Sequence, residues 1–259
     1  MRGILLFIIS LISLNLAVAQ FNETIRTGRP GQAIGAFTVG TGVFQLQSGF
    51  DYFGNKNSAN DARQKGFLNN TVFRYGLTEP FEISALIEYK TERTSQGNNE
   101  SDQKGLRAFD VGIRYNIYSG KGLVPNVGFQ IRMRLPILAD AYHINNMAPR
   151  FIIATSQQLS NTFNLITNFG AAWNGFDSKP LGTYVVNLSF PFNDRLGSFV
   201  EAFGTFGGGN LFMNFDSGLA WLITSNLQLD IYGGYGNNYR INDYFVSTGV
   251  SWRTKKNKS

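Results

Sequence analysis

FEISALIEYKT, residues 81–91, is the stretch that decides the fold of this chain. Apolar side chains occupy its odd-numbered positions from 81 to 89, while Glu82, Glu88 and Lys90 stand at even-numbered ones. Side chains of a β-strand point alternately to its two faces, so this period of two predicts a strand with one apolar and one polar face. A tilted transmembrane strand needs about 9–11 residues, which is the length of this stretch.

The same alternation returns along the chain, for example in VFQLQSGFDYF at 43–53. An even number of antiparallel strands closes a sheet without an exposed edge, and a closed barrel is the β-structure that a bilayer accepts. We therefore predict an all-β fold, a transmembrane antiparallel up-and-down β-barrel of about 12 strands. The predicted strands are 43–53, 67–77, 81–91, 106–118, 124–135, 149–159, 163–174, 181–192, 196–206, 210–223, 227–236 and 244–253.

Composition favours the same class. Aromatic residues make up 14% of the chain, yet its mean hydropathy is close to neutral, because polar positions dilute the apolar ones in each strand. A soluble, secreted β-sandwich is the alternative, but large apolar side chains line one face of every predicted strand. The chain contains no cysteine, so neither a lipid-anchored N-terminus nor a disulfide scaffold is predicted.

The N-terminus carries the features of an export signal. Arg2 precedes an apolar stretch at 4–16, and Ala17-Val18-Ala19 forms a small-residue cleavage site before Gln20. An uncleaved membrane anchor is the alternative, but the apolar run is short for a spanning helix. We predict a signal peptide at 1–19, an N-terminal periplasmic or plug segment at 20–42, the barrel at 43–253, a basic tail at 254–259, and the outer membrane as location. Segment 20–42 can alternatively form an extra strand.

Connections between the strands are of two kinds. Residues 54–65, 92–105 and 136–148 are predicted as long polar loops, whereas 78–80, 119–122 and 160–162 are predicted as tight turns. Membrane barrels have short periplasmic turns and longer outer loops, so both termini are predicted to be periplasmic. Amphipathic aromatic rings near strand ends are candidates for interfacial girdles. They are Tyr52, Tyr75, Tyr89, Tyr115, Tyr118, Trp173, Tyr184, Tyr235, Tyr244 and Trp252.

Polar positions within the strands are the candidate functional residues, because they should point into the lumen. Arg114, Arg132 and Arg134 are expected to form a ladder set against Glu82 and Glu88 on another wall, which is the composition of a selective constriction. In the alternative interpretation the charges pair across a narrow lumen and only satisfy one another. The lumen candidates are Arg74, Glu82, Glu88, Lys90, Asp110, Arg114, Gln130, Arg132, Arg134, Glu201, Asp216 and Asp230.

Two stretches resemble a known family. Thr27-Gly-Arg29-Pro30-Gly-Gln32, followed by Ala36-Phe-Thr-Val39 and GVFQLQSGF at 42–50, is similar to the start of the meta-pathway phenol-degradation family, and YGLTEPFEI at 75–83 is similar to one of its hairpins. Gly28 stands where that family would have an acidic residue. The resemblance implies a transporter-like outer-membrane barrel, of the type found in Bacteroidetes, that takes up small, aromatic or otherwise hydrophobic compounds.

The sequence leaves two other functions open. A structural or surface-interaction barrel would have a closed pore and active outer loops. A lipid hydrolase would need a base beside a nucleophile, and the sole histidine, His143, lies near Asn145, Asn146 and Ser156 in sequence, but nothing in this spacing enforces that geometry. We predict no enzyme activity, no cofactor and no metal site.

The expected partners follow from this class of protein. Outer-membrane lipid, an unidentified small solute and the barrel-assembly machinery are predicted, the last through an assembly signal that includes Trp252. The net charge is +6, but the basic excess is spread over strands and the tail, so no nucleic acid is expected.

Overall fold

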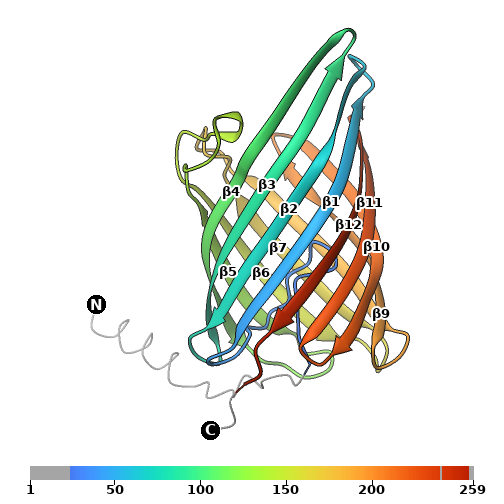
Figure 1. Cartoon of the computed structure of the whole chain (residues 1–259). Helices are drawn as coiled ribbons and strands as arrows, with labels where there is room; N and C mark the ends of the chain where they lie inside the picture. The colour runs from blue at the N-terminus through green and yellow to red at the C-terminus, as the bar shows by residue number, and fades with distance from the viewer. Residues whose placement is uncertain (1–23, 240, 257–259) are drawn as a thin grey trace, which may run out of the picture.

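The protein forms a closed barrel (Figure 1). The computed structural model describes residues 24–239 and 241–256, and in this part of the chain twelve strands pair antiparallel in sequence order, with β1 joined to β12. The predicted fold class is confirmed. The strands are β1 (Phe44–Asn57), β2 (Ala62–Gly76), β3 (Phe81–Gln96), β4 (Asn99–Tyr118), β5 (Asn126–Arg134), β6 (Ala148–Gln158), β7 (Asn164–Ala172), β8 (Leu181–Pro191), β9 (Leu196–Gly207), β10 (Asn210–Thr224), β11 (Leu227–Asn238) and β12 (Ile241–Arg253).

Helical structure is almost absent from the described residues. One 3-10 turn, η1 (Asp140–Tyr142), lies in the connection between β5 and β6. No helix in residues 24–239 and 241–256 is long and apolar enough to cross a membrane. The predicted signal peptide at 1–19 lies outside the described residues.

The barrel is polar inside and apolar outside. Buried side chains among the described residues include twenty polar or charged residues and only twelve apolar ones, of which five belong to the chain before β1. Large apolar side chains on the strands, such as Phe50, Phe169 and Phe215, are instead exposed on the outer surface. Lipid replaces water as the partner of that surface, so the period of two in the sequence separates lipid-facing from lumen-facing residues.

The predicted girdle residues lie mostly on this outer surface. Eight of them are exposed, namely Tyr52, Tyr75, Tyr89, Tyr115, Tyr118, Tyr235, Tyr244 and Trp252. Trp173 and Tyr184 are half-buried; Trp173 donates to the Ser178 carbonyl, and Tyr184 donates to the Phe212 carbonyl.

Two predicted loops are in fact extensions of strands, and the prediction is wrong there. Residues 54–65 and 92–105 continue β1, β2, β3 and β4 into two long hairpins that project beyond the rest of the barrel (Figure 1). Arg93 pairs with Asp102 at 2.7 Å across the second hairpin. Beyond the bilayer a strand has no lipid face, so its sequence loses the apolar alternation while its backbone ladder continues.

Trp252 provides a test of the assembly prediction. Its ring is exposed on the outer face of β12 and contacts Phe44 edge-on, with 6.5 Å between ring centroids. We expect Trp252→Ala to lower the amount of folded barrel in outer-membrane fractions, because the interfacial aromatic near the end of the last strand is lost. Trp221→Ala, which removes an equally lipid-exposed indole from β10, is the control. Equal membrane levels of all three proteins would contradict a special role of Trp252.

Candidate functional site in the barrel lumen

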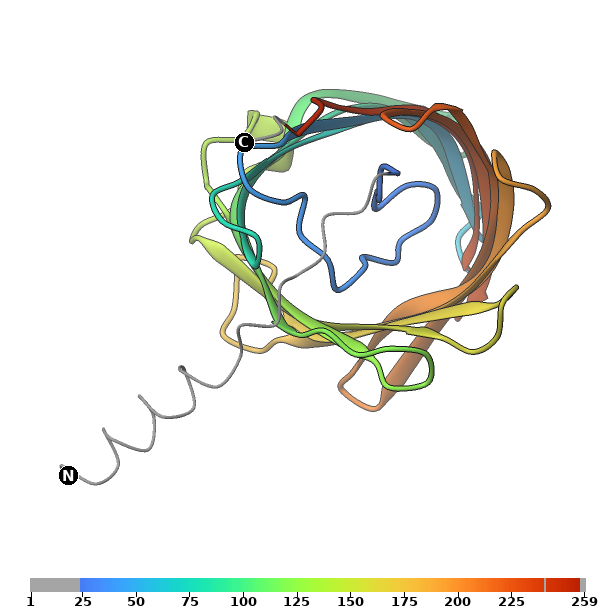
Figure 2. The ribbon, with the colours of Figure 1, turned by 90° about the horizontal axis from the view of Figure 1, so that it is seen from below.

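The chain before β1 lies inside the barrel. Residues 24–43, called here the inner segment, wind through the ring of strands without forming a strand themselves (Figure 2). An irregular segment needs partners for its backbone N–H and C=O groups, and the wall supplies them. Its partners come from nine strands, through Gln45 and Gln47 of β1, Arg74 of β2, Glu82 of β3, Arg114 and Asn116 of β4, Ser156 of β6, Asn168 of β7, Glu201 of β9, Gln228 and Asp230 of β11, and Ser247 of β12.

Arg29 anchors the inner segment to one wall. Its guanidinium donates to Asp230 at 2.9 Å and to Ser247 at 2.8 Å, and it lies 5.2 Å from the centre of the Tyr232 ring. Two glycines that face each other across β1 and β12, Gly49 and Gly249, make space for it, because a methyl group at either position would overlap the guanidinium. The Arg29 side chain is 8% exposed, so this ion pair is shielded from water.

A second anchor follows immediately in the chain. Pro30 lines the cavity described below, and Gly31 has a φ of +94° that brings its backbone against Phe199. This turn aims two successive N–H groups, those of Gln32 and Ala33, at Glu201, with distances of 2.6 and 3.0 Å. Glu201 thus acts as an acceptor for the backbone of the inner segment.

The opposite end of the inner segment is held by a buried cluster of charges. Glu82 accepts two hydrogen bonds from Arg74, at 2.8 and 2.7 Å, and Arg114 lies 3.6 Å away. Glu82 also accepts the Val39 N–H at 2.9 Å, while both arginines donate to the Phe37 carbonyl. One carboxylate therefore joins two strands of the wall to the inner segment.

At two glycines the wall of the barrel lies very close to the backbone of the inner segment. Gly128 of β5 faces Ala36, and Gly76 at the end of β2 faces Gly40; a side chain at either glycine would overlap the backbone of the inner segment. Gly76 also accepts the Gly42 N–H at 2.8 Å. The wall is therefore shaped for this segment at the glycines as well as at the polar residues.

The predicted lumen residues all face the interior. Nine of the twelve are buried, and Lys90, Arg132 and Arg134 are partly buried. The structure brings Arg74, Glu82 and Arg114 together, and it pairs Arg134 with Asp110 at 2.8 Å. In the register of neighbouring strands, Glu201 lies opposite Asp216, and Gln130 lies opposite Arg114. Arg107 pairs with Glu88, Lys90 with Glu92, and Asp230 with Arg29.

One part of the prediction is wrong. Glu82 and Glu88 do not form a wall opposite the arginines, because Glu82 is the direct register partner of Arg114 on the adjacent strand. Antiparallel neighbours share a face, so opposite charges at paired positions meet on one wall. Sequence reasoning also missed the uncharged contacts of the inner segment, such as Asn168, Ser156 and Gln228. They occupy lumen-facing positions of the alternation, which was the available signal.

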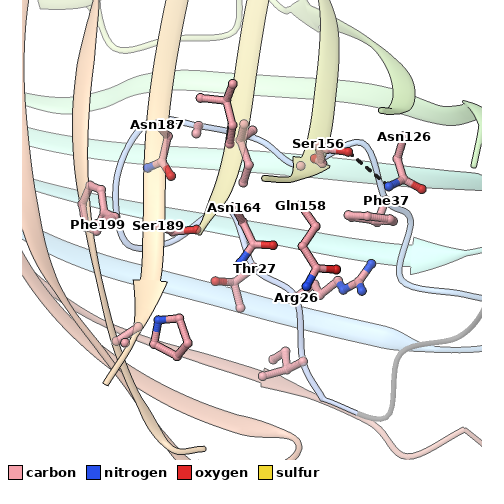
Figure 3. Close-up of a pocket in the computed structure, with 18 of the residues that line it drawn as sticks. Arg26, Thr27, Phe37, Asn126, Ser156, Gln158, Asn164, Asn187, Ser189 and Phe199 are labelled. Atoms are coloured by element: carbon pink, nitrogen blue, oxygen red, sulfur yellow. Dashed lines mark hydrogen bonds between the residues drawn. The ribbon is translucent and has the colours of Figure 1, made fainter. Parts of the chain in front are cut away.

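A cavity of about 1120 Å³ lies beside the inner segment (Figure 3). It is at the end of the barrel that holds the short connections β4–β5, β6–β7 and β8–β9. Arg26, Thr27 and Phe37 of the inner segment face amides and hydroxyls of the wall, and Asn126 donates to the Ser156 carbonyl at 3.1 Å. The lining also includes the apolar residues Phe190, Phe199, Leu165, Leu196 and Leu222.

The hydrolase arrangement is not assembled. Ser156 is buried in the lumen and accepts the Ala36 N–H, whereas the His143 ring packs edge-on against Phe176 beyond the other end of β6. Among the described residues no group of three or more acidic, histidine or cysteine side chains is placed to hold a metal ion.

The fold and the polar lumen define an outer-membrane β-barrel with a segment of its own chain inside it. The chain belongs to the family described as "Putative MetA-pathway of phenol degradation", whose model matches residues 27–254. The resemblance noted in the sequence is thereby confirmed. No curated protein sequence matches the chain significantly.

Solved structures support the same architecture. The COG4313 outer membrane channel from Pseudomonas putida F1 superposes with a TM-score of 0.69 at 12% identity, over 89% of this chain and 100% of that one. The KdgM porin in complex with oligogalacturonate gives a TM-score of 0.54 at 12% identity, over 79% and 98% of the two chains. The transport unit of the autotransporter AIDA-I from Escherichia coli gives 0.56 at 11% identity, over 94% and 97%. At these identities the likeness concerns the fold, and none of the three is described as an enzyme.

Proposed function

We propose that this protein is an outer-membrane channel for the uptake of small aromatic or otherwise hydrophobic compounds, and that the inner segment is its gate. The proposal rests on the kind of contact that holds the inner segment to the wall of the barrel. Many of these contacts are hydrogen bonds and ion pairs to polar residues of the wall. Water can replace such bonds, and each contributes about 0.5–1.5 kcal/mol net, or about 1.5–3 kcal/mol where one partner is charged. The buried apolar side chains of the inner segment, Ile25, Ala33, Ala36, Val39 and Val43, include no aromatic ring, so release of the segment exposes a limited apolar surface.

The proposal also assigns the orientation of the barrel in the membrane. The connections β2–β3, β6–β7, β8–β9 and β10–β11 are short and lie at the end of the barrel where the inner segment enters and β12 ends, whereas the long hairpins lie at the other end (Figure 1). Short turns are typical of the periplasmic side. The cavity would then open toward the periplasm, where a solute leaves the barrel. The family match and the fold shared with the P. putida channel support transport as the function.

A reversible tether tests whether the inner segment gates the pore. A Cβ placed on Gly35 would lie 3.7 Å from Ser156 Oγ, so cysteines at the two positions would be neighbours, and the chain has no cysteine of its own that could compete. We expect the double variant Gly35→Cys/Ser156→Cys to show few openings in a planar bilayer when oxidised. After reduction with dithiothreitol, discrete conductance steps should appear, and phenol in the bath should block them.

The two single-cysteine variants are the controls, because they carry the same side-chain changes without a cross-link. Equal conductance of the oxidised and reduced double variant would show that the inner segment does not gate. A folded, reduced protein that never conducts would favour the alternative function, a structural or surface-interaction barrel without an open pore.

A further inference from the structure

Two arginines of the lumen stand directly opposite each other. Arg132 of β5 and Arg150 of β6 are register partners, and they share the lumen face with Gln130 and Ser156. Like charges at directly opposed positions destabilise a pair of strands. The pairing therefore calls for a compensating negative charge.

In the part of the chain that the structure describes, no carboxylate pairs directly with either arginine; Asp110, which acts on both at longer range, already pairs with Arg134 at 2.8 Å. Neither the Arg132 nor the Arg150 side chain has a hydrogen bond or an ion pair there, and the Nε of Arg132 is buried without a partner. The other arginines of this wall are all engaged: Arg74 and Arg114 with Glu82, Arg134 with Asp110, and Arg107 with Glu88. Six guanidinium groups thus face three carboxylates, and the positive surplus is concentrated at Arg132 and Arg150.

The surroundings of the pair are small or apolar. Gly112 is the register neighbour of Arg132, and a side chain at Gly112 would overlap the Arg132 stem. Ala172 is the neighbour of Arg150, and Ala148 that of Arg134. Arg150 remains exposed although it faces the lumen. It lies two residues after Ala148, where β6 begins, on the side of the long hairpins. A solute entering from that side reaches this pair before it reaches the inner segment.

We propose that Arg132 and Arg150 bind the carboxylate of a small organic anion. A guanidinium presents a planar set of N–H donors that can bind a carboxylate through two parallel hydrogen bonds. One carboxylate bound between two neighbouring guanidinium groups offsets the repulsion between their positive charges. Ile152, Ala148 and Ala172 line the adjacent wall with apolar surface for the body of the solute. The inference deepens the proposed function, on which it rests for the route of the solute, by specifying an aromatic or aliphatic carboxylate as its class.

Equilibrium dialysis of radiolabelled benzoate against the full mature protein in detergent tests the site without requiring flux. We expect benzoate to bind at low ionic strength and benzyl alcohol, which lacks the charge, not to bind measurably. Arg132→Gln and Arg150→Gln should each weaken benzoate binding by about tenfold, since each removes charge-assisted hydrogen bonds. Arg63→Gln, which removes a positive charge from an exposed position of the β1–β2 hairpin, is the matched control and should leave binding unchanged.

The outcomes separate this inference from the proposed channel. Benzoate binding that depends on both arginines supports the site even if the protein never conducts. A conducting protein that binds benzoate and benzyl alcohol equally, or binds neither, overturns the site while the channel stands. Displacement of benzoate by chloride as readily as by unlabelled benzoate also overturns it, because the pair would then be a general site for inorganic anions.

Discussion

Deletion of residues 25–41 is expected to raise the single-channel conductance of the refolded barrel on the order of tenfold. Barrels of eight strands are filled by their own side chains, whereas those of sixteen or more leave a wide channel, so a twelve-stranded barrel without its inner segment should hold a continuous aqueous path. The deletion removes the groups that bond to Asp230, Glu201 and Glu82 across the lumen. Planar-bilayer recording measures the effect.

Point variants separate opening of the pore from damage to the barrel. Arg29→Ala removes the ion pair with Asp230, and Gly249→Val places a side chain where the Arg29 guanidinium lies, so both should increase the frequency of openings. Arg63→Ala, an exposed hairpin residue, is the control. Folding of every variant is checked by the heat-dependent shift in electrophoretic migration. An unchanged conductance of a correctly folded deletion variant would mean that other residues close the lumen.

Glu82→Gln is expected to have the largest effect on stability. Glu82 is 0% exposed and is the only carboxylate paired with Arg74 and Arg114 among the described residues. Removing one partner of a buried ion pair leaves the other charge without compensation, which costs about 3–5 kcal/mol. Urea unfolding in lipid vesicles, followed by tryptophan fluorescence, measures the loss of free energy of unfolding.

Glu100→Gln is the matched control, because Glu100 also pairs with an arginine, Arg93, but on an exposed hairpin. It should leave stability unchanged, since exposed ion pairs contribute little. Glu82→Gln should also loosen the inner segment, because Val39 loses a charged acceptor. A stability equal to that of the unmodified protein would show that water or another group compensates the two arginines.

Most charges of the lumen are paired, but between neighbouring strands of one wall and not across the lumen as one interpretation of the sequence predicted. Arg134 with Asp110 and Arg107 with Glu88 are pairs of this kind. Such pairs hold the wall together and leave little charge for a solute. Arg132 differs, because its partner in register is another arginine. Selectivity, in our proposal, therefore resides in the few lumen groups that the wall leaves unpaired.

Sequence reasoning succeeded where one physical constraint acts on each residue separately. The strand FEISALIEYKT was predicted with its faces because lipid on one side and a polar lumen on the other impose a period of two. The hairpin at 92–105 was misjudged because no lipid acts beyond the bilayer, and only the backbone ladder continues there. Segment 20–42 has no periodicity, so three placements stayed open.

By itself, the sequence determined that the protein is an outer-membrane barrel of about twelve strands, and it assigned many of the charged side chains to the lumen. Only the tertiary structure decided which of those side chains meet. Arg29 reaches Asp230, 201 positions away in sequence, because β11 and the inner segment are brought together by closure of the barrel. Likewise Arg114 meets Glu82, and Arg132 meets Arg150, through the register of neighbouring strands. The alternation of apolar and polar residues fixes the face of the strand on which a side chain lies. The register of neighbouring strands and the closure of the barrel depend on the whole sheet, and they decide where the proposed gate and the proposed anion site lie.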